Sequence, residues 1–295
     1  MLHPMRTIVA GVASLDAPDP LLPHAAETAR ALGATLHVVH AFDAPEGEDA
    51  GSGVLAELRR RLEERVRADA PGAAVECHVV EGEATECLPE VARAVGAELV
   101  VVGATRKNRI WRHFLGTTAE GVVRRAEVPV LVQRSSLADG PRRVLLATDL
   151  SEAGAEVHER GLDAAAALCP GCAPDVRSLL VVEDGAAPPA PRVAREQAAQ
   201  RRLDAFVRGR RPRARGVQCK VRLGVPADEI LAEASEWAAD LVVLGTNGHA
   251  GAPPHHLGST AGATLRGAPC NVLAVPSAAR AAPPGEALRA PLPAA

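Results

Sequence analysis

Aromatic side chains are scarce in this sequence of 295 residues: they make up 2% of it, and tyrosine is absent. The hydrophobic core therefore has to be built mainly from alanine, valine and leucine. Proteins that hold single-stranded nucleic acid commonly stack the bases on aromatic rings, so this composition argues against that class of binding. The formal net charge of −3 gives no long-range attraction for polyanions either. Any phosphate ligand has to be held by local geometry.

Long apolar runs are also missing. No stretch reaches the roughly 18 apolar residues of a membrane-spanning helix, and the apolar run near the N-terminus is too short for a signal peptide. The six cysteines are scattered and mostly lie in apolar runs, as expected of reduced, buried thiols. Cys169 and Cys172 have the spacing of a redox pair but follow a helical pattern, so we interpret the Pro-Gly turn between them as a helix end. We expect a cytoplasmic protein with no membrane partner.

The sequence does contain an internal repeat. The segment that begins at Leu99 matches the segment that begins at Leu241, and the offset of 142 residues stays constant. The same offset relates Gly103 and Gly245, Gly116 and Gly258, Thr118 and Thr260, Val130 and Val272, and Cys77 and Cys219. A register kept over so many positions indicates two copies of one domain.

Each copy alternates short valine- and leucine-rich runs with helical patterns. Strands are expected at 6–12, 35–42, 74–80, 98–103 and 129–133, and again at 143–149, 176–184, 216–223, 240–245 and 271–276. Helices are expected at 23–33, 54–70, 84–96, 156–169, 193–210 and 227–239. This alternation predicts an α/β fold with two repeated domains, each an open five-stranded parallel sheet with helices on both faces. We place the domains at 1–138 and 139–280, followed by a disordered, alanine- and proline-rich tail at 281–295.

The segment 245–260 of the second copy combines glycines, prolines and three histidines between an apolar strand and a helix start. Gly245 and Gly248 allow the backbone to approach a ligand closely. The helix then opens with Gly-Ser-Thr at 258–260, where free N–H groups, the helix dipole and two hydroxyls attract an anion. In an open parallel sheet, such a loop lies where ligands bind, outside the carboxyl ends of the strands. The segment therefore predicts a phosphate-binding loop.

The pattern G-x2-G-x9-G-[ST] after a strand resembles the nucleotide loop of the universal stress protein family, and it is met by Gly245, Gly248, Gly258 and Ser259. The opening of this copy, VLLATDLSEAG, also resembles the family's, with an aspartate and then a serine just past the first strand. The resemblance covers both copies and indicates a tandem member of the family. It implies the strand order 3-2-1-4-5 in each domain.

The resemblance also implies that ATP, with or without Mg²⁺, binds in the second copy. Asp149 would contact the adenosine, Val182 would border the adenine, and the glycines would line the ribose and phosphate path. The implied ATP-binding residues are Asp149, Val182, Gly245, Thr246, Gly248, Gly258, Ser259 and Thr260. No metal-binding or catalytic residue is assigned.

The implied function is an ATP-binding sensor or regulator of the stress response that acts on an unidentified regulatory protein partner. The chain has no G-x-x-x-x-G-K-[ST] motif, and its two lysines, Lys107 and Lys220, lie outside the loop of the second copy. A site without a placed base or cationic clamp hydrolyses ATP slowly if at all, so we expect at most a slow ATPase. The alternative is a nucleotide-free interaction scaffold with vestigial clefts. An enzyme that catalyses adenylate chemistry on the same fold is the least favoured hypothesis.

The first copy departs from the pattern at two positions. Ala13 stands where Asp149 stands in the second copy, and Arg106 replaces the second loop glycine. A loop without that glycine cannot bring its backbone as close to a ligand, so we expect a degenerate, structural copy. Binding of phosphates by the cationic side chains at 106–112 stays open as the alternative.

Three other features of the sequence bear on possible ligands and partners. His249, His255 and His256 have no carboxylate beside them and do not converge easily on one ion, so solvated histidines are expected rather than a metal site. The arginine-rich run at 208–216 follows a helix and lacks aromatic residues, so no nucleic acid partner is expected. The last strand of each copy leaves two arrangements open: pairing between chains in a homodimer, or pairing with each other within one chain.

Overall fold

The computed structural model describes residues 5–17, 19–43, 52–104, 116–169, 171, 173–183, 191–209, 216–247 and 256–277. The strands of the first copy are β1 (Thr7–Gly11), β2 (Thr35–Phe42), β3 (Val75–Glu81), β4 (Leu99–Gly103) and β5 (Val130–Gln133), and its helices are α1 (Leu21–Leu32), α2 (Ser52–Asp69), α3 (Ala84–Ala94) and α4 (Thr117–Arg125). The second copy has strands β6 (Arg143–Thr148), β7 (Asp175–Val182), β8 (Gln218–Leu223), β9 (Leu241–Gly245) and β10 (Asn271–Val275), and helices α5 (Glu152–Ala167), α6 (Arg192–Arg208), α7 (Pro226–Glu236) and α8 (Ser259–Gly267). The predicted α/β fold with two repeats is confirmed.

Two helices differ from the expected bounds by more than two residues. Helix α5 begins at Glu152 rather than near residue 156, because the Ser151 hydroxyl caps it by accepting a hydrogen bond from the Gly154 N–H. Helix α7 ends at Glu236 rather than near residue 239, because Ala238 has a left-handed backbone with φ 49° and cannot continue the helix. Both differences come from local backbone geometry that hydrophobic periodicity does not report.

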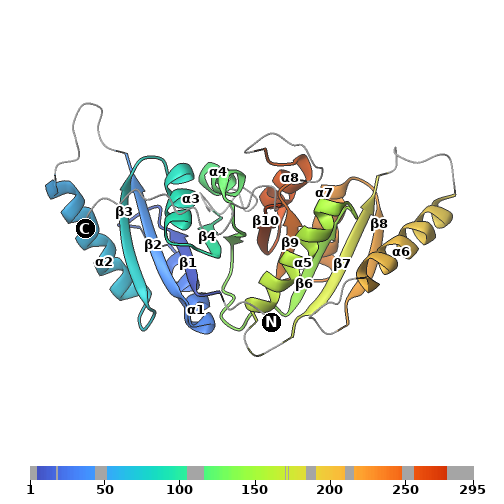
Figure 1. Ribbon diagram of the computed structural model, residues 1–295, viewed down its shortest axis with the longest axis horizontal. Helices are drawn as coiled ribbons and strands as arrows, with labels where there is room; N and C mark the ends of the chain where they lie inside the picture. Colours follow the sequence, from blue (N-terminus) through green and yellow to red (C-terminus); the bar gives the residue numbers. More distant parts are fainter. Residues whose placement is uncertain are drawn as a thin grey trace.

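All ten strands form one sheet in the order β3-β2-β1-β4-β5-β10-β9-β6-β7-β8 (Figure 1). Within each copy the paired strands are parallel and follow the order 3-2-1-4-5, as predicted. In the middle of the sheet β5 and β10 pair in antiparallel fashion, with Val132 opposite Val272. The last strands of the two copies therefore pair with each other within the chain.

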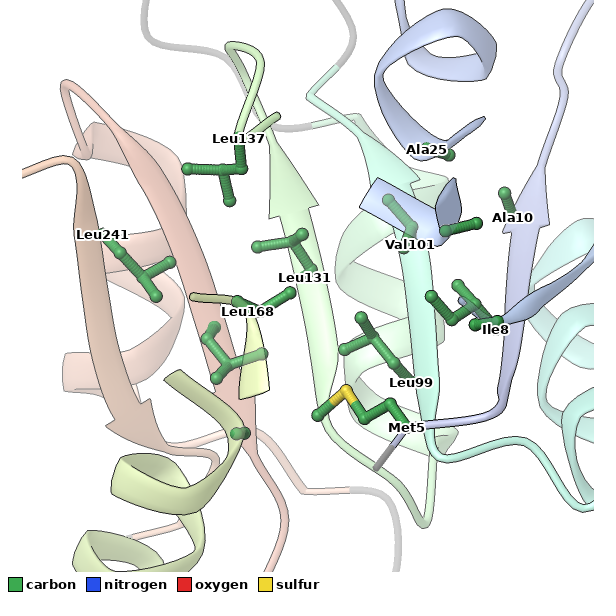
Figure 2. Packing of buried hydrophobic residues seen from close by; sticks show 14 of the residues in the cluster. Met5, Ile8, Ala10, Ala25, Leu99, Val101, Leu131, Leu137, Leu168 and Leu241 are labelled. Atoms are coloured by element: carbon green, nitrogen blue, oxygen red, sulfur yellow. The ribbon is translucent and has the colours of Figure 1, made fainter. Parts of the chain in front are cut away.

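Helices cover both faces of the sheet, and the core on each face runs through both copies. Apolar residues of α1, α2 and α5 pack on one face, and those of α3, α4, α7 and α8 pack on the other. Figure 2 shows Leu99 and Leu131 of the first copy in one cluster with Leu168 and Leu241 of the second. Helix α6 packs through Leu203 in a smaller cluster on the outer strands of the second copy. Alanine, valine and leucine dominate these clusters, as the composition predicted.

The cysteines follow the expected pattern as far as the structure describes them. Five of them are free thiols with buried or intermediate side chains. Helix α5 ends at Ala167, and the thiol of Cys169 then donates to the Pro141 carbonyl at 3.0 Å, consistent with a helix end. Cys172 and the tail at 281–295 lie outside the described residues. Across the ranges that the structure describes, no helix is long and apolar enough to cross a membrane.

Candidate functional site

A cleft of about 620 Å³ opens at the carboxyl ends of β6 and β9. These two strands are neighbours, and the sheet continues to β7 on one side and to β10 on the other, so the strand order reverses between them. Ligands of open α/β sheets bind at such a reversal. Six of the eight predicted ATP-binding residues line the cleft: Asp149, Gly245, Thr246, Gly258, Ser259 and Thr260.

The other two predicted residues, Gly248 and Val182, are not among the described residues that line the cleft. Gly248 lies outside the described residues. Val182 does not line the cleft; it packs against the small cluster that contains Leu180 and Leu203. Side chains alternate along a strand, so Val181 takes the place that was expected for Val182 and does line the cleft. Helix α6 gives β7 a second apolar face, and the sequence alone could not show which of two adjacent valines faces which side.

The loop after β6 holds Asp149 in a fixed local structure. One carboxylate oxygen, Oδ1, accepts hydrogen bonds from the backbone N–H and the hydroxyl of Ser151, at 2.9 and 2.7 Å. A Cβ at Gly154 would collide with this same oxygen, so glycine leaves the space that the carboxylate occupies. The Asp149 side chain is exposed, and its other oxygen, Oδ2, has no hydrogen bond from the described part of the chain. One oxygen thus fixes the side chain, and the other is left to accept a hydrogen bond from a ligand.

Helix α8 presents its N-terminus to the cleft. Gly258 is the N-cap and supplies no capping side chain, and the first N–H that is bonded within the helix is that of Gly262, which donates to the Gly258 carbonyl at 2.9 Å. The N–H groups of the first helical turn therefore have no partner within the helix. The hydroxyls of Ser259 and Thr260 lie beside them on the cleft wall. Such an arrangement attracts an anion.

Three hydrogen bonds hold together the base of the loop between β9 and α8. The Gly258 N–H donates to the Thr246 carbonyl at 2.9 Å. The Asn247 side-chain amide, oriented to satisfy its neighbours, donates to the carbonyls of His256 and Thr246 at 2.6 and 2.8 Å. These bonds fix the start of α8 against the end of β9. Asn247 was not predicted, although an asparagine beside a glycine in a loop is a recognisable signal for such a bond.

The remaining walls of the cleft are mostly apolar. Val181, Pro226, Ile230 and Leu244 contribute to them from β7, α7 and β9. Apolar walls with a few convergent polar groups are typical of small-molecule sites. The described lining includes no lysine or arginine, and the N-terminus of α8 contributes the positive end of its dipole.

The first copy has a cleft of about 850 Å³ at the corresponding place, lined among others by Gly103, Thr117 and Thr118. Strand pairing confirms the alignment of the two copies: β1 Ile8 pairs with Leu99 as β6 Val144 pairs with Leu241. By this register, Ala13 is the counterpart of Asp149, so the first cleft lacks that carboxylate. Residues 105–115, which include Arg106, lie outside the described residues.

Together, the doubly wound sheet and the cleft at its strand reversal define a class of α/β proteins that bind small ligands on helix N-termini. The family model of the universal stress protein family matches residues 4–134 and 140–276. A universal stress protein of Thermus aquaticus, from the QAH/OAS sulfhydrylase 3′ region, is 34% identical over 113 residues, which cover 36% of this chain and 82% of the relative. The chain belongs to the universal stress protein family and carries two family domains in tandem.

Solved structures agree on the fold. A universal stress protein from Archaeoglobus fulgidus superposes with a TM-score of 0.62 at 20% identity and covers 91% of this chain and 96% of its own. A candidate universal stress protein from Pseudomonas aeruginosa UCBPP-PA14 superposes with a TM-score of 0.67 at 18% identity and covers 94% and 95%. In both comparisons nearly the whole tandem chain is matched, so the arrangement of two domains is shared as well.

Proposed function

We propose that the protein is a regulator of the stress response that binds ATP in the cleft of its second copy. The observation that supports this most directly is the pairing of two unlike groups across one cleft. A fixed carboxylate, Asp149, lies after β6, and an uncapped helix N-terminus, that of α8, follows β9. A nucleotide has matching ends: sugar hydroxyls that donate hydrogen bonds and phosphates that accept them.

The residues of the cleft fit ATP in three parts. Val181, Ile230 and Pro226 would flank the adenine, and Asp149 Oδ2 would accept from the adenosine portion. The phosphates would be held by the first N–H groups of α8 and by the hydroxyls of Ser259 and Thr260. Buried Thr246 supports the fit, because its Oγ1 has no hydrogen-bond partner in the described structure and a ligand or its water would supply one.

Regulation rather than turnover agrees with the electrostatics of the cleft. A helix N-terminus carries the equivalent of roughly half a positive charge, well short of the charge on a triphosphate. Because the described lining has no cationic side chain, Mg²⁺ bound to the phosphates would supply the missing charge. The same lining presents no basic clamp on a leaving phosphate, so ATP would be held and released rather than rapidly hydrolysed.

The first prediction tests this site by ATP binding to the full chain. We expect one ATP per chain and a loss of affinity of about tenfold or more in Asp149→Ala, since one missing ligand contact costs about 1.4 kcal/mol. Asp149→Asn should weaken binding as well while keeping an acceptor for Ser151, which separates the ligand contact from the turn. Glu152→Ala, which removes a neighbouring exposed carboxylate outside the cleft lining, serves as the control.

Isothermal titration calorimetry, checked by mass spectrometry of nucleotides released from the purified protein, measures both stoichiometry and affinity. Two equal sites per chain would contradict the assignment to the second copy. Parental affinity in Asp149→Ala would remove Asp149 from the site, and no ATP binding at millimolar concentration would favour the nucleotide-free scaffold.

A further inference from the structure

On the first copy, three side chains with metal-binding groups meet outside the lining of either cleft. His37 lies on β2, and Glu76 and His78 lie on the neighbouring strand β3. One nitrogen or oxygen atom from each lies within 4.8 Å of those of the other two. The cleft of the first copy begins at Val39 on β2, past His37, and none of the three residues lines it. The group is therefore separate from any nucleotide site.

Strand register explains why the three side chains share one face. His37 pairs with Glu76, and alternation along β3 returns the side chain of His78 to the same side. Val39 lies two residues after His37, so both side chains are on the same face of β2. Val39 packs in the cluster beneath α3 and α4, so His37, Glu76 and His78 also point to that face. Cys77, between Glu76 and His78, points to the opposite face and packs against the other cluster. His37 and His40 are both buried, on opposite faces of β2.

We propose that His37, Glu76 and His78 form a binding site for one divalent transition-metal ion of the Zn²⁺ type. His37 Nδ1, His78 Nε2 and a Glu76 carboxylate oxygen would be its three protein ligands. Water would complete the coordination, because Glu76 is exposed and opens the group to solvent. Two imidazoles and one carboxylate are a ligand set that suits Zn²⁺ and its neighbours in the first transition row.

The distances fit such an ion after a small adjustment. His37 Nδ1 lies 2.9 Å from His78 Nε2, in a hydrogen bond whose donor depends on the tautomer, and 3.5 Å from Glu76 Oε2. Tetrahedral Zn²⁺ with Zn–N bonds of about 2.0–2.1 Å places adjacent ligand atoms about 3.3 Å apart. The two imidazole nitrogens have to separate by about 0.4 Å, in exchanging a shared proton for the metal, and the Glu76 oxygen lies within 4.8 Å of both.

The state of the imidazoles also favours coordination. Burial lowers the pKa of both His37 and His78, and the His37 ring lowers the pKa of His78 further; Glu76 acts in the opposite direction and raises both. Neutral imidazole is the form that binds metals. The pair is thus available to a cation without first losing a charge near neutral pH.

At the corresponding position of the second copy, other side chains replace the three metal-binding residues. By strand pairing, Arg177 is the counterpart of His37 and Gln218 that of Glu76. The Arg177 guanidinium donates to Gln218 Oε1 at 2.7 Å and to buried Glu233 at 2.5 Å, and it stacks over Trp237 at 4.2 Å. A permanent cation thus occupies the place in the second copy where the first copy gathers two imidazoles and a carboxylate. The first copy would acquire its cation from solution.

The test is calorimetric titration of the metal-free full chain with Zn²⁺ in a buffer that does not bind metals. We expect one Zn²⁺ per chain and a higher melting temperature with Zn²⁺ present, because the ion binds only the folded arrangement. Co²⁺ in place of Zn²⁺ should give the visible absorption of a four- or five-coordinate ion with nitrogen and oxygen ligands. No Zn²⁺ binding by the parent chain at micromolar to millimolar concentration would overturn the proposal.

Substitutions that introduce the residues of the second copy at the same positions identify the metal ligands with little risk to the fold. His78→Lys introduces the residue found at Lys220, and Glu76→Gln the residue found at Gln218. We expect at least a tenfold loss of Zn²⁺ affinity in each, a larger loss for His78→Lys, and unchanged circular dichroism without metal. The controls Cys77→Ser and Glu81→Gln change the same strand, and His256→Gln changes the loop of the other copy; each should keep parental affinity. Parental affinity in both ligand variants, or its loss in Cys77→Ser or His256→Gln, would overturn the assignment.

Discussion

Leu150 has a left-handed backbone conformation, with φ 61°, which costs a non-glycine residue about 1–2 kcal/mol. It lies between Asp149 and Ser151, whose side chains are hydrogen-bonded to each other. In the first copy, the described residues after β1 include no such conformation, and Ala13 offers no carboxylate to place. The strain thus occurs in the copy that carries the carboxylate. This supports the view that the turn is shaped to hold Asp149 for a ligand.

The other left-handed non-glycine residue of the described chain, Ala238, allows a stability prediction. Its counterpart at the end of α3 is Gly96, with φ 64° and open space around it. Ala238→Gly should therefore raise the free energy of unfolding by about 0.5–1 kcal/mol, because glycine has no Cβ penalty in this conformation. Gly96→Ala should lower it by a similar amount. Urea unfolding measures both, and a destabilised Ala238→Gly would contradict the argument.

Cys270 gives a prediction about alkaline pH. Burial raises the pKa of its thiol from 9.0 to about 11. The unfolded chain loses this proton first, so the contribution is fully present below pH 9 and is lost as the pH rises towards 11. The loss should reach at most about 2–3 kcal/mol. Melting temperatures between pH 8 and 11 should fall less in Cys270→Ala than in the parent; parallel curves would show that this thiol is not responsible.

At the scale of elements, helices α5 and α8, which both border the cleft of the second copy, begin differently. Helix α5 is capped by the hydroxyl of Ser151, whereas α8 begins at Gly258 without a side-chain cap. An uncapped helix start keeps its N–H groups for another acceptor. Asn247 holds this start in place through the carbonyl of His256. The phosphate end of the proposed site therefore depends on backbone groups and on the two hydroxyls beside them.

The double variant Ser259→Ala with Thr260→Ala should weaken ATP more than adenosine. It removes two hydroxyl donors at the phosphate end and leaves the adenosine end unchanged, so we expect a loss of roughly tenfold for ATP and less than twofold for adenosine. Thr117→Ala with Thr118→Ala is the matched control, because it makes the corresponding change at the start of α4 in the first copy. Calorimetry with both ligands measures the difference. Equal losses for ATP and adenosine would place the phosphates elsewhere.

The helices and strands of this chain could be predicted well because the apolar runs are continuous and because the repeat contains each strand pattern twice. The position of the strands and of Gly245 and Gly258 at the cleft followed from those features, whereas the strand order 3-2-1-4-5 was implied by the resemblance to the universal stress protein family. Two kinds of detail did not. The choice between Val181 and Val182 depends on which face α6 covers, and the start of α5 depends on one cap by Ser151. The first is decided by packing between β7 and α6, and the second by one local hydrogen bond. Neither leaves a periodic signal in the sequence.

At the scale of the whole molecule, the antiparallel pairing of β5 with β10 turns two domains into one sheet. The paired residues Leu131 and Leu273 are fully buried, and the apolar clusters on both faces continue across this junction. Figure 2 shows one of these clusters. Such a junction satisfies the sheet edge that each domain would otherwise expose. The sequence left this pairing as one of two possibilities, because the equivalent last strands of the two copies can pair between chains as readily as within one.

Asn271 gives the last prediction, because its buried side chain ties the junction together. Its Oδ1 accepts from the backbone N–H groups of Arg134 and Ser135 at 2.7 and 3.1 Å, and its Nδ2 donates to the Asp240 carbonyl at 3.3 Å. Asn271→Ala would leave these groups without partners, at about 1–3 kcal/mol for each one that water cannot reach.

We therefore expect Asn271→Ala to lower the free energy of unfolding by about 2–4 kcal/mol in urea titrations. Asn271→Asp, which keeps the acceptor oxygen, should lose less. Both variants should still unfold in a single transition, since the apolar contacts on either side of β5 and β10 remain. Two separate transitions in Asn271→Ala would mean that this side chain, and not the shared core, couples the two copies.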